Sequence, residues 1–441
     1  MFQNKKYILA VKIIKKLQKK GFEAYFAGGC VRDFLLKKKF KDIDIATNAT
    51  PDDVKKIFKK TIEVGKQFGV VKLIYYGNEY EITTFRKDIN YFDGRHPEKI
   101  EFCGIEEDAK RRDFTINALY YDVNKNKVLD FVNGVADLKN KIIRAVGAPD
   151  ERFQEDKLRI IRAIRFAIRL NFKIEKKTYQ SIKKFANKIR EVSFERIREE
   201  LKLILTNKGA DEAIRLISKT GILKEILPEV ENLKGVKQPE EFHPEGDVFE
   251  HTLLMLKYMK KPTFTLAMGA LLHDIGKPVT FKIEDRIRFN EHECVGAEIA
   301  EKICERFKLS NKEKEQIVSL VREHMKFMFV KEMRLAKLKR LLNMENFSEH
   351  LELHRLDCLA SHKNLENYHF CKKKLKEFAN EINIKKIRLI TGDDLISLGF
   401  KPSPIFKTIL NEIEDLTLEK KLTTKEEAIN YVINKYNNFR N

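Results

Sequence analysis

The alternation of hydrophobic and polar positions divides the chain into a mixed amino-terminal part and a long helical remainder. Short segments rich in β-branched and aromatic residues predict strands, and apolar residues at helical spacing predict helices. The predicted strands cover residues 22–27, 42–46, 70–76, 79–85 and 117–122, and the predicted flanking helices cover residues 6–19 and 51–59. After about residue 150 almost every segment has helical period, with breaks at Gly221, Pro228, Pro262 and Gly392. The pattern therefore predicts a small α/β head followed by an all-helical body.

Two local signals set boundaries within the head. Thr50 followed by Pro51 predicts a capped helix start, because proline suits the first helical turn and threonine can accept a hydrogen bond there. Gly77-Asn78 predicts a hairpin turn between the strands at 70–76 and 79–85.

Composition narrows the class of protein. The chain has 441 residues, 43% hydrophobic and 35% charged, which is typical of a soluble protein of two to four domains. No apolar run approaches the roughly 20 residues that span a bilayer, and lysines interrupt the apolar residues near the start. The six cysteines form no C-x-x-C pair, so we expect reduced thiols. We therefore expect a cytoplasmic protein with no membrane partner.

Charge and histidine are distributed in opposite ways. The net charge is +21, and residues 141–220 alone carry 21 lysines and arginines against 11 acidic residues. Residues 241–360 carry 20 of each, yet nine of the ten histidines lie beyond residue 240. A lysine-rich surface explains part of the excess, but its concentration in one stretch indicates contact with phosphates. We expect two chemistries in two regions.

A glycine pair and an acidic pair stand close together in the head. Gly28-Gly29 follows a predicted strand, where paired glycines let backbone amides approach a phosphate chain, although an isolated pair is more often a tight turn. Asp42 and Asp44 alternate along the next strand and so share a face. Two carboxylates this close repel each other unless a divalent cation, typically Mg²⁺, lies between them. Such a metal pair can support in-line displacement on a triphosphate.

The motifs of the first 205 residues, taken in order, resemble the class II tRNA nucleotidyltransferase and poly(A) polymerase family. They are Gly28-Gly29-Cys30-Val31-Arg32-Asp33, Asp42-Ile43-Asp44, Arg111 to Ala118, Glu155-Asp156-Lys157-Leu158-Arg159 and Ser193 to Ile197. The resemblance implies template-independent addition of nucleotides to an RNA 3′ end, with Asp42 and Asp44 binding the catalytic Mg²⁺. It implies that Arg112 and Asp113 contact the triphosphate and ribose, and Glu81 is our candidate third carboxylate.

A base-selecting element is predicted between residues 156 and 169. If Asp156 and Arg159 share a helix, they emerge on one face as an acceptor beside a donor fork, which can imitate a Watson–Crick edge. The alternative is an ordinary surface ion pair. Arg162, Arg165 and Arg169 continue the basic face and are candidates to neutralise phosphates.

The products open to this family are CCA, CC, A alone, or a poly(A) tail. Residues 86–98 resemble the flexible loop of CCA-adding and A-adding enzymes, which disfavours CC addition. Residues 64–71 resemble the tRNA-specific version, and the additional arginine pattern of poly(A) polymerases is absent there. We predict CCA addition to tRNA from CTP and ATP, with A-only addition or poly(A) synthesis as the alternatives.

The second region carries histidines and carboxylates at intervals that suggest a metal site. His273-Asp274 ends a predicted buried helix, and His251 and Asp357 lie in apolar helical patterns, so the four can converge on one ion. This H…HD…D order resembles the HD phosphohydrolase superfamily from about 245 to 360. His292 and His324 are candidates for a second metal or a substrate phosphate. A lone histidine is usually structural, but this series predicts a divalent metal and a possible phosphatase or phosphodiesterase activity.

These inferences define an α+β protein with a polymerase-β-like nucleotidyltransferase head and an elongated all-α neck, body and tail. The expected domains are a nucleotidyltransferase head at 1–140, a helical neck at 141–240, an HD domain at 241–365 and a helical tail at 366–441. We expect a monomer or homodimer. An HD enzyme with a merely regulatory head is the competing hypothesis, and the intact Asp42 and Asp44 pair argues against it.

Overall fold

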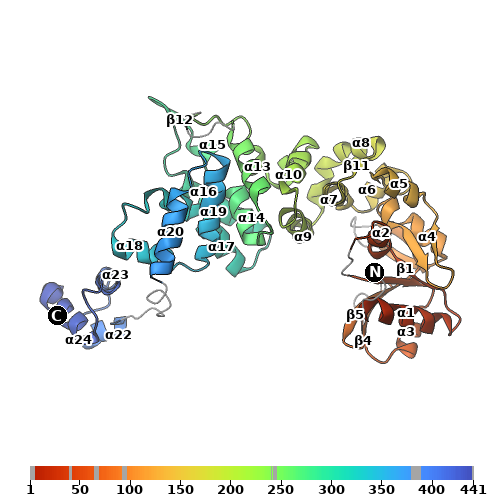
Figure 1. The fold of residues 1–441 in the computed structure, drawn as a ribbon, viewed down its shortest axis with the longest axis horizontal. Helices are drawn as coiled ribbons and strands as arrows, with labels where there is room; N and C mark the ends of the chain where they lie inside the picture. The colour runs from red at the N-terminus through yellow and green to blue at the C-terminus, as the bar shows by residue number, and fades with distance from the viewer. Residues whose placement is uncertain are drawn as a thin grey trace. The chain divides into compact units, whose positions relative to one another are not determined.

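The computed structural model describes residues 5–38, 42–63, 69–91, 97–239, 241, 246–378 and 389–439 (Figure 1). The chain forms two compact units, which are treated separately below. The first unit is Met1–Glu231 with Arg306–Lys308, and the second is Asn232–Glu305 with Leu309–Asn441. None of the helices within the described ranges is long and apolar enough to cross a bilayer.

A seven-stranded sheet organises the first unit. Its strands run in the order β3-β4-β5-β2-β1-β8-β9, and β2 and β5 are the parallel neighbours in an otherwise antiparallel arrangement. The strands are β1 (Ala24–Ala27), β2 (Asp44–Thr47), β3 (Thr61–Glu63), β4 (Val70–Tyr75), β5 (Asn78–Thr84), β8 (Leu119–Asp122) and β9 (Lys127–Asp130). A separate hairpin pairs β6 (Arg86–Tyr91) with β7 (Pro97–Phe102).

Helices cover and follow this sheet in the first unit. Those of the head are α1 (Lys5–Gln18), α2 (Gly29–Leu35), α3 (Pro51–Ile57), α4 (Ile105–Lys110), η2 (Thr115–Asn117) and α5 (Gly134–Asn140). The later elements are β10 (Ile142–Ile143), α6 (Pro149–Glu155), α7 (Arg159–Leu170), β11 (Lys173–Ile174), α8 (Lys176–Lys184), η3 (Ala186–Glu191), α9 (Phe194–Leu205), α10 (Ala210–Lys219), α11 (Leu223–Ile226) and α12 (Pro228–Glu231). The amphipathic spacing of α1 buries Leu9, Ile13 and Leu17.

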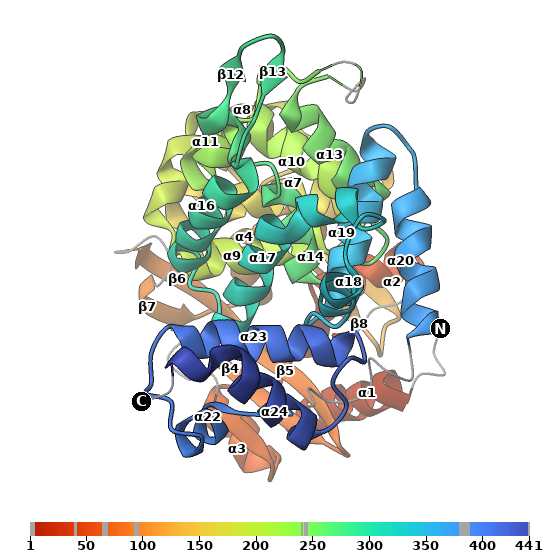
Figure 2. The ribbon, with the colours of Figure 1, turned by 90° about the vertical axis from the view of Figure 1, so that its left-hand side faces the viewer.

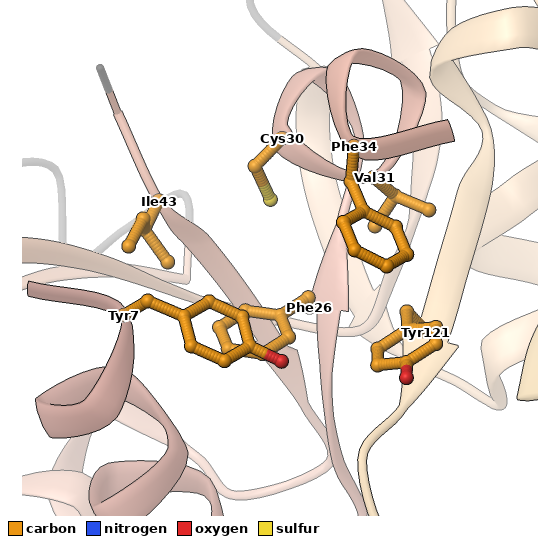
Figure 3. A pocket seen from close by; sticks show the side chains of 7 residues that line it. All are labelled: Tyr7, Phe26, Cys30, Val31, Phe34, Ile43 and Tyr121. Atoms are coloured by element: carbon orange, nitrogen blue, oxygen red, sulfur yellow. The ribbon is translucent and has the colours of Figure 1, made fainter. Parts of the chain in front are cut away.

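An apolar cluster fixes α2 to the sheet. Figure 3 shows Cys30, Val31 and Phe34 of α2 gathered with Tyr7, Phe26, Ile43 and Tyr121 around one small cavity. The Tyr7 and Phe26 rings stack at 5.2 Å, and the Phe34 and Tyr121 rings lie 5.3 Å apart. This packing sets the position of the turn that begins the helix, because the helix cannot slide without breaking aromatic contacts.

The second unit is helical (Figure 2). It contains α13 (Val248–Tyr258), α14 (Phe264–Leu272), α15 (Lys277–Thr280), β12 (Lys282–Ile283), β13 (Ile287–Arg288), α16 (His292–Arg306), α17 (Asn311–Glu323), η4 (His324–Phe329), α18 (Leu335–Leu342), α19 (Phe347–Ala360), α20 (Glu366–Glu377), α22 (Gly392–Ser397), α23 (Ile405–Leu418), α24 (Lys425–Tyr436) and η5 (Asn437–Phe439). Helix α14 packs against α13, α17 and α19. Apart from Thr265, its residues are nonpolar and buried, because the helix lies inside this group.

The predicted α+β class is confirmed, and each predicted strand overlaps an observed one. The hairpin prediction was wrong by one residue. Tyr75 pairs with Asn78, so the turn consists of Tyr76 and Gly77, both with positive φ, as this tight turn type requires. The Thr50 cap is present as a full capping box with Asp53. Of the loop-like segment 86–98, the flanking residues form β6 and β7, and residues 92–96 lie outside the described residues.

Candidate active sites in the two units

The glycine turn of the head lies against two charged groups. Gly28 joins β1 to α2 with φ 68° and ψ −129°, a conformation that side chains with a Cβ rarely adopt. A Cβ at Gly28 would lie 3.0 Å from Arg112 Nη1 and 3.9 Å from Asp44 Oδ2. Glycine is therefore needed both for the backbone conformation and for the close approach of Arg112.

Three carboxylates border the same cleft. Asp44 begins β2 and pairs in parallel register with Glu81 of β5, and Asp42 precedes the strand. Burial and the charge of Glu81 raise the pKa of Asp44 to about 6, and Arg112 partly offsets this effect. Carboxylates that destabilise one another in this way are a donor set suited to a hard divalent cation. The residues present therefore fit Mg²⁺.

A buried network holds Arg112 under the turn. Arg112 Nη2 donates to Asp108 Oδ2 at 3.0 Å, and Arg112 Nε donates to the Tyr120 hydroxyl at 3.1 Å. Although burial raises it, the charges of Arg112 and Arg111 hold the pKa of Asp108 well below its ordinary range. Sequence reasoning missed Asp108. Its spacing of four residues before Arg112 at the end of α4 was the available signal.

Asp113 is turned toward protein partners. Its Oδ2 accepts from Arg162 at 2.6 Å, and its Oδ1 accepts from Asn117 Nδ2 at 3.0 Å and from the Phe114 amide at 2.8 Å. Burial opposes ionisation, but Arg162 lowers the pKa of Asp113 to about 2. Asp113 lines the cleft, yet in this arrangement its carboxylate orients Arg162.

Phe166 forms a platform for three guanidinium groups. Arg165, Arg32 and Arg162 lie over its ring at 4.3, 5.2 and 5.5 Å. Arg32 also bonds Asp33 and Asn117, and Arg165 donates to Glu200 at 2.5 Å. Stacking and ion pairing together keep these groups in place without a bound anion.

The expectation that Asp156 and Arg159 share one helix was wrong. Asp156 ends α6 in an extended conformation, and α7 begins at Arg159. The Asp156 side chain accepts from the Leu158 amide at 3.1 Å, so it caps the turn before α7. Its other oxygen accepts from Arg196 at 2.8 Å, and Arg159 donates to Glu155 at 2.7 Å. Both residues nevertheless line the cleft, each held by a partner.

The cleft of the first unit has a volume of about 950 Å³ and contains Gly28, Gly29 and all of the proposed head residues. Nine arginines line it, and among the residues that the structure describes no lysine does, although lysine outnumbers arginine more than twofold along the chain. They are Arg32, Arg86, Arg111, Arg112, Arg159, Arg162, Arg165, Arg169 and Arg196. Arginine offers planar donor pairs that match phosphates and base edges, so this composition suits a nucleoside triphosphate.

The second unit brings all six predicted metal residues together in two adjoining groups. The ligand atoms of His251, His273 and Asp357 lie within 4.8 Å of one another, and so do those of Asp274, His292 and His324. His251 Nε2 lies 3.2 Å from Asp357 Oδ1. His273 Nε2 lies 3.1 Å from Asp274 Oδ2, and His292 Nε2 lies 3.4 Å from Asp274 Oδ1. Asp274 therefore links the two groups.

Backbone contacts orient three of the imidazoles. The Nδ1 atoms of His273, His292 and His324 lie 2.9, 2.8 and 2.6 Å from the carbonyl oxygens of residues three positions earlier. Each of these carbonyl oxygens can accept the Nδ1 proton, which leaves the Nε2 atom of each ring directed at the cluster. His292 Nε2 and His324 Nε2 then face each other at 3.2 Å, an arrangement that a cation between or beside them stabilises.

Burial reinforces this donor set. Desolvation, followed by the neighbouring His273 and His292, lowers the pKa of His324 to about 3. Asp274 stays ionised despite complete burial because His273 and Lys277 hold its pKa well below its ordinary range. Neutral imidazoles and ionised carboxylates are the forms that ligate metals, and the mixed nitrogen and oxygen set fits a divalent transition metal.

The backbone of the turn at Gly276 lies in direct contact with the backbone at the start of α16, beside the ligand groups. A Cβ at Gly276 would lie 2.1 Å from the His292 carbonyl oxygen, so only glycine allows the turn after His273 to touch the start of α16. Lys277, which follows this turn, is buried and donates to Asp274 at 2.7 Å. From the sequence alone, no role was assigned to Lys277.

The sheet, its carboxylate edge and the arginine-lined cleft define a nucleotidyltransferase head, and comparisons with known proteins give the family. Residues 24–144 match the poly A polymerase head domain, residues 171–234 match the probable RNA and SrmB-binding site of polymerase A, and residues 248–360 match the HD domain. The chain belongs to the tRNA nucleotidyltransferase and poly(A) polymerase family and carries a fused HD domain.

Relatives in this family are similar in sequence and in structure. The CCA-adding enzyme of Lactobacillus delbrueckii subsp. bulgaricus is 45% identical over 217 residues, which are 49% of this chain and 54% of the relative. That of Enterococcus faecalis is 48% identical over 198 residues, 44% of this chain and 48% of the relative. The matches thus span about half the length of these curated relatives. The crystal structure of the Bacillus stearothermophilus CCA-adding enzyme in complex with CTP is 27% identical, covers 99% of both chains and has a TM-score of 0.77.

Proposed function

We propose that the first unit adds CCA to the 3′ end of tRNA from CTP and ATP without a template. The observation that carries this proposal is the alignment of Asp44 with Glu81 beside Gly28, at the edge of a cleft lined by nine arginines. The names of the relatives and the CTP complex of the Bacillus enzyme support the choice of product.

The chain's own residues account for binding and orientation. Asp42 and Asp44, with Glu81 beside them, would hold Mg²⁺, and the glycine turn brings backbone amides of α2 near the phosphates. Bound Mg²⁺ supplies charge neutralisation at the triphosphate and favours the alkoxide form of the RNA 3′ hydroxyl. The RNA 3′ oxygen attacks the α-phosphorus while the bond to the leaving pyrophosphate breaks. Arg112 and the other cleft arginines neutralise the negative charge of the phosphates.

The base is selected by protein groups in this proposal. Asp156 supplies an acceptor and Arg159 a donor pair, and both are pre-oriented by Arg196 and Glu155. Arg162, held by Asp113, and Arg165, held by Glu200, present further guanidinium groups to the same cleft. A fixed acceptor beside a fixed donor pair can recognise the edges of cytosine and adenine.

The test uses the full chain and a tRNA transcript that lacks its CCA end. Incorporation of CTP, followed by one AMP, supports CCA addition. Incorporation of ATP only onto a transcript that already ends in CC identifies an A-adding enzyme, and long A tails on unrelated RNA identify a poly(A) polymerase. No incorporation by the wild type, at a level equal to that of the Asp42→Ala variant, contradicts the proposal.

We further propose that the second unit is a metal-dependent phosphohydrolase. The convergence of His251, His273, Asp274, His292, His324 and Asp357 supports it. Nucleotides with a terminal or cyclic phosphate and phosphate-ended RNA are the proposed substrates, and a metal bound there would activate water. Hydrolysis of such substrates with Mn²⁺ that is lost in His273→Ala, while CCA addition continues, is the expected result.

We place these activities in the cytoplasm, with the protein acting as a monomer or homodimer. The proposed domains are the head at 1–140, the neck at 141–240, the HD domain at 241–365 and the tail at 366–441. All six cysteines are free thiols, as expected for a reducing compartment. Sedimentation of the full chain with and without tRNA measures the oligomeric state.

A further inference from the structure

A buried glutamine outside every matched family region contacts Lys277, which borders the histidine cluster of the second unit. Gln238 lies before α13, between the matched segments 171–234 and 248–360. Its side chain is 5% exposed, and its Oε1 accepts from Lys277 Nζ at 2.7 Å. Lys277 in turn donates to Asp274 Oδ2 at 2.7 Å. Two hydrogen bonds, both made by Lys277, therefore connect Gln238 to the carboxylate that links the two ligand groups.

The contact fixes a cation that is otherwise costly to bury. Lys277 is 6% exposed, and its Nζ lies 5.3 Å from the centre of the Phe289 ring. An ammonium group has three donors, and Asp274 and Gln238 accept two of its hydrogen bonds. The ammonium group is therefore held at the edge of the cluster, and its third N–H can donate a hydrogen bond to an anion that binds there.

The amide nitrogen of Gln238 has no hydrogen-bond partner among the residues that the structure describes. A buried donor without a partner destabilises the fold unless a ligand or water accepts its hydrogen bond. Gln316 is the useful comparison, because it is also a buried glutamine of this unit and its Oε1 and Nε2 both have protein partners.

We propose that Gln238 and Lys277 form the phosphate-binding subsite of the histidine cluster. Gln238 Oε1 positions the Lys277 ammonium group, and Gln238 Nε2 donates to an oxygen of the phosphate group of the substrate. This proposal rests on the proposed phosphohydrolase function of the second unit. The ligand class is a phosphate monoester or its inorganic phosphate product, because one cation and one neutral donor beside a metal centre complement a compact oxyanion.

The test measures binding of inorganic phosphate to the full chain by calorimetry, with and without Mn²⁺. Asp42→Asn and Asp44→Asn are included in every protein to remove the carboxylates of the head, and only the Mn²⁺-dependent component is compared. We expect Gln238→Leu to weaken that component about tenfold or more, as the loss of a hydrogen bond to a charged group implies. Titration of Mn²⁺ alone should give the same affinity as the parent, because Gln238 is not a metal ligand.

Two further variants separate binding from folding. Gln316→Leu removes an equally buried amide away from the cluster and should leave phosphate affinity unchanged. Gln238→Glu keeps the acceptor for Lys277 but removes the donor and adds negative charge, so it should bind phosphate at least as weakly as Gln238→Leu. Full affinity in Gln238→Glu overturns the donor role, and full affinity in Gln238→Leu overturns the subsite. If the parent binds Mn²⁺ and hydrolyses substrates, and both Gln238 variants bind phosphate as tightly as the parent, only this inference fails. A parent that binds neither Mn²⁺ nor phosphate overturns the phosphohydrolase proposal as well.

Discussion

Asp44 and Glu81 lie opposite each other on the parallel strands β2 and β5, so their negative charges repel each other. The pKa of Asp44 rises to about 6 in the folded protein through burial and the charge of Glu81. The ordinary value of 3.8 applies to the unfolded chain. The ionised carboxylate therefore destabilises the fold at pH values above about 6, and this cost disappears as the pH falls toward 4.

Asp44→Asn should raise the free energy of unfolding at pH 7.5 while it abolishes nucleotide addition. The expected gain is on the order of 1–3 kcal/mol in the absence of divalent ions, and it should vanish near pH 4. Urea unfolding at both pH values measures it. Asp53→Asn is the control of opposite sign, because its bonds with Thr50 lower the pKa of Asp53. Equal stability of wild type and Asp44→Asn at pH 7.5 would contradict the electrostatic argument.

Gly28→Ala should disable the head. Its Cβ would meet Arg112 at 3.0 Å, and the backbone conformation is costly for alanine by about 1–3 kcal/mol. We expect a lower melting temperature and at least a hundredfold loss of nucleotide incorporation. Gly29→Ala is the matched control, because it lies in α2 and its Cβ would be 3.6 Å from the flexible end of Arg32. Similar losses in both variants would show that the turn tolerates no side chain at all and that Arg112 is not the cause.

Arg196→Met should relax nucleotide choice more than it slows addition. Arg196 holds Asp156 at 2.8 Å, and loss of a hydrogen bond to a charged group costs about 1.5–3 kcal/mol. We expect discrimination between CTP and UTP to fall about tenfold, measured as the ratio of kcat/KM values on tRNA that lacks its CCA end. Arg190→Met, which removes the exposed partner of the buried Glu225 side chain and lies outside the cleft lining, should leave the ratio unchanged. An unaltered ratio in Arg196→Met would remove Asp156 from base selection.

Divalent transition metals should stabilise the second unit. A metal at a hundred times its dissociation constant adds about 2.7 kcal/mol to the free energy of unfolding, so Mn²⁺ should raise the melting temperature in an Asp42→Asn, Asp44→Asn background. His251→Ala should abolish this rise, because His251 faces Asp357 within the ligand group. His362→Ala, which changes a histidine outside both groups, should retain it. A rise that persists in His251→Ala would place the ion elsewhere.

The order of elements followed from periodicity, because β-branched segments and amphipathic helices carry their signal within a few residues. The pairing of Asp44 with Glu81 depends on strand order, and nothing local in residues 44 or 81 encodes it. The candidate third carboxylate could be named from the sequence, but its register could not. For Asp108 the spacing to Arg112 is local, but the bond with Tyr120 forms only when the fold brings α4 to β8.

The base-selecting pair shows how a local inference can fail. The i, i+3 spacing of Asp156 and Arg159 fits a helix, but Asp156 competes for backbone donors and caps the following turn instead. In the second unit the six ligands were predicted from residue type and order. Gln238 escaped notice because a single glutamine in an irregular segment carries no pattern, and its contact with Lys277 arises from tertiary packing.

The use of arginine alone along the described cleft wall has a consequence for chemical regulation. Enzymatic or spontaneous acetylation acts on lysine amines and leaves guanidinium groups intact. Acetylation of exposed lysines therefore removes positive charge that attracts RNA. The cleft arginines, which we propose bind the triphosphate, keep their charge. When lysines are acetylated, the protein would lose affinity for RNA before it lost affinity for the nucleoside triphosphate.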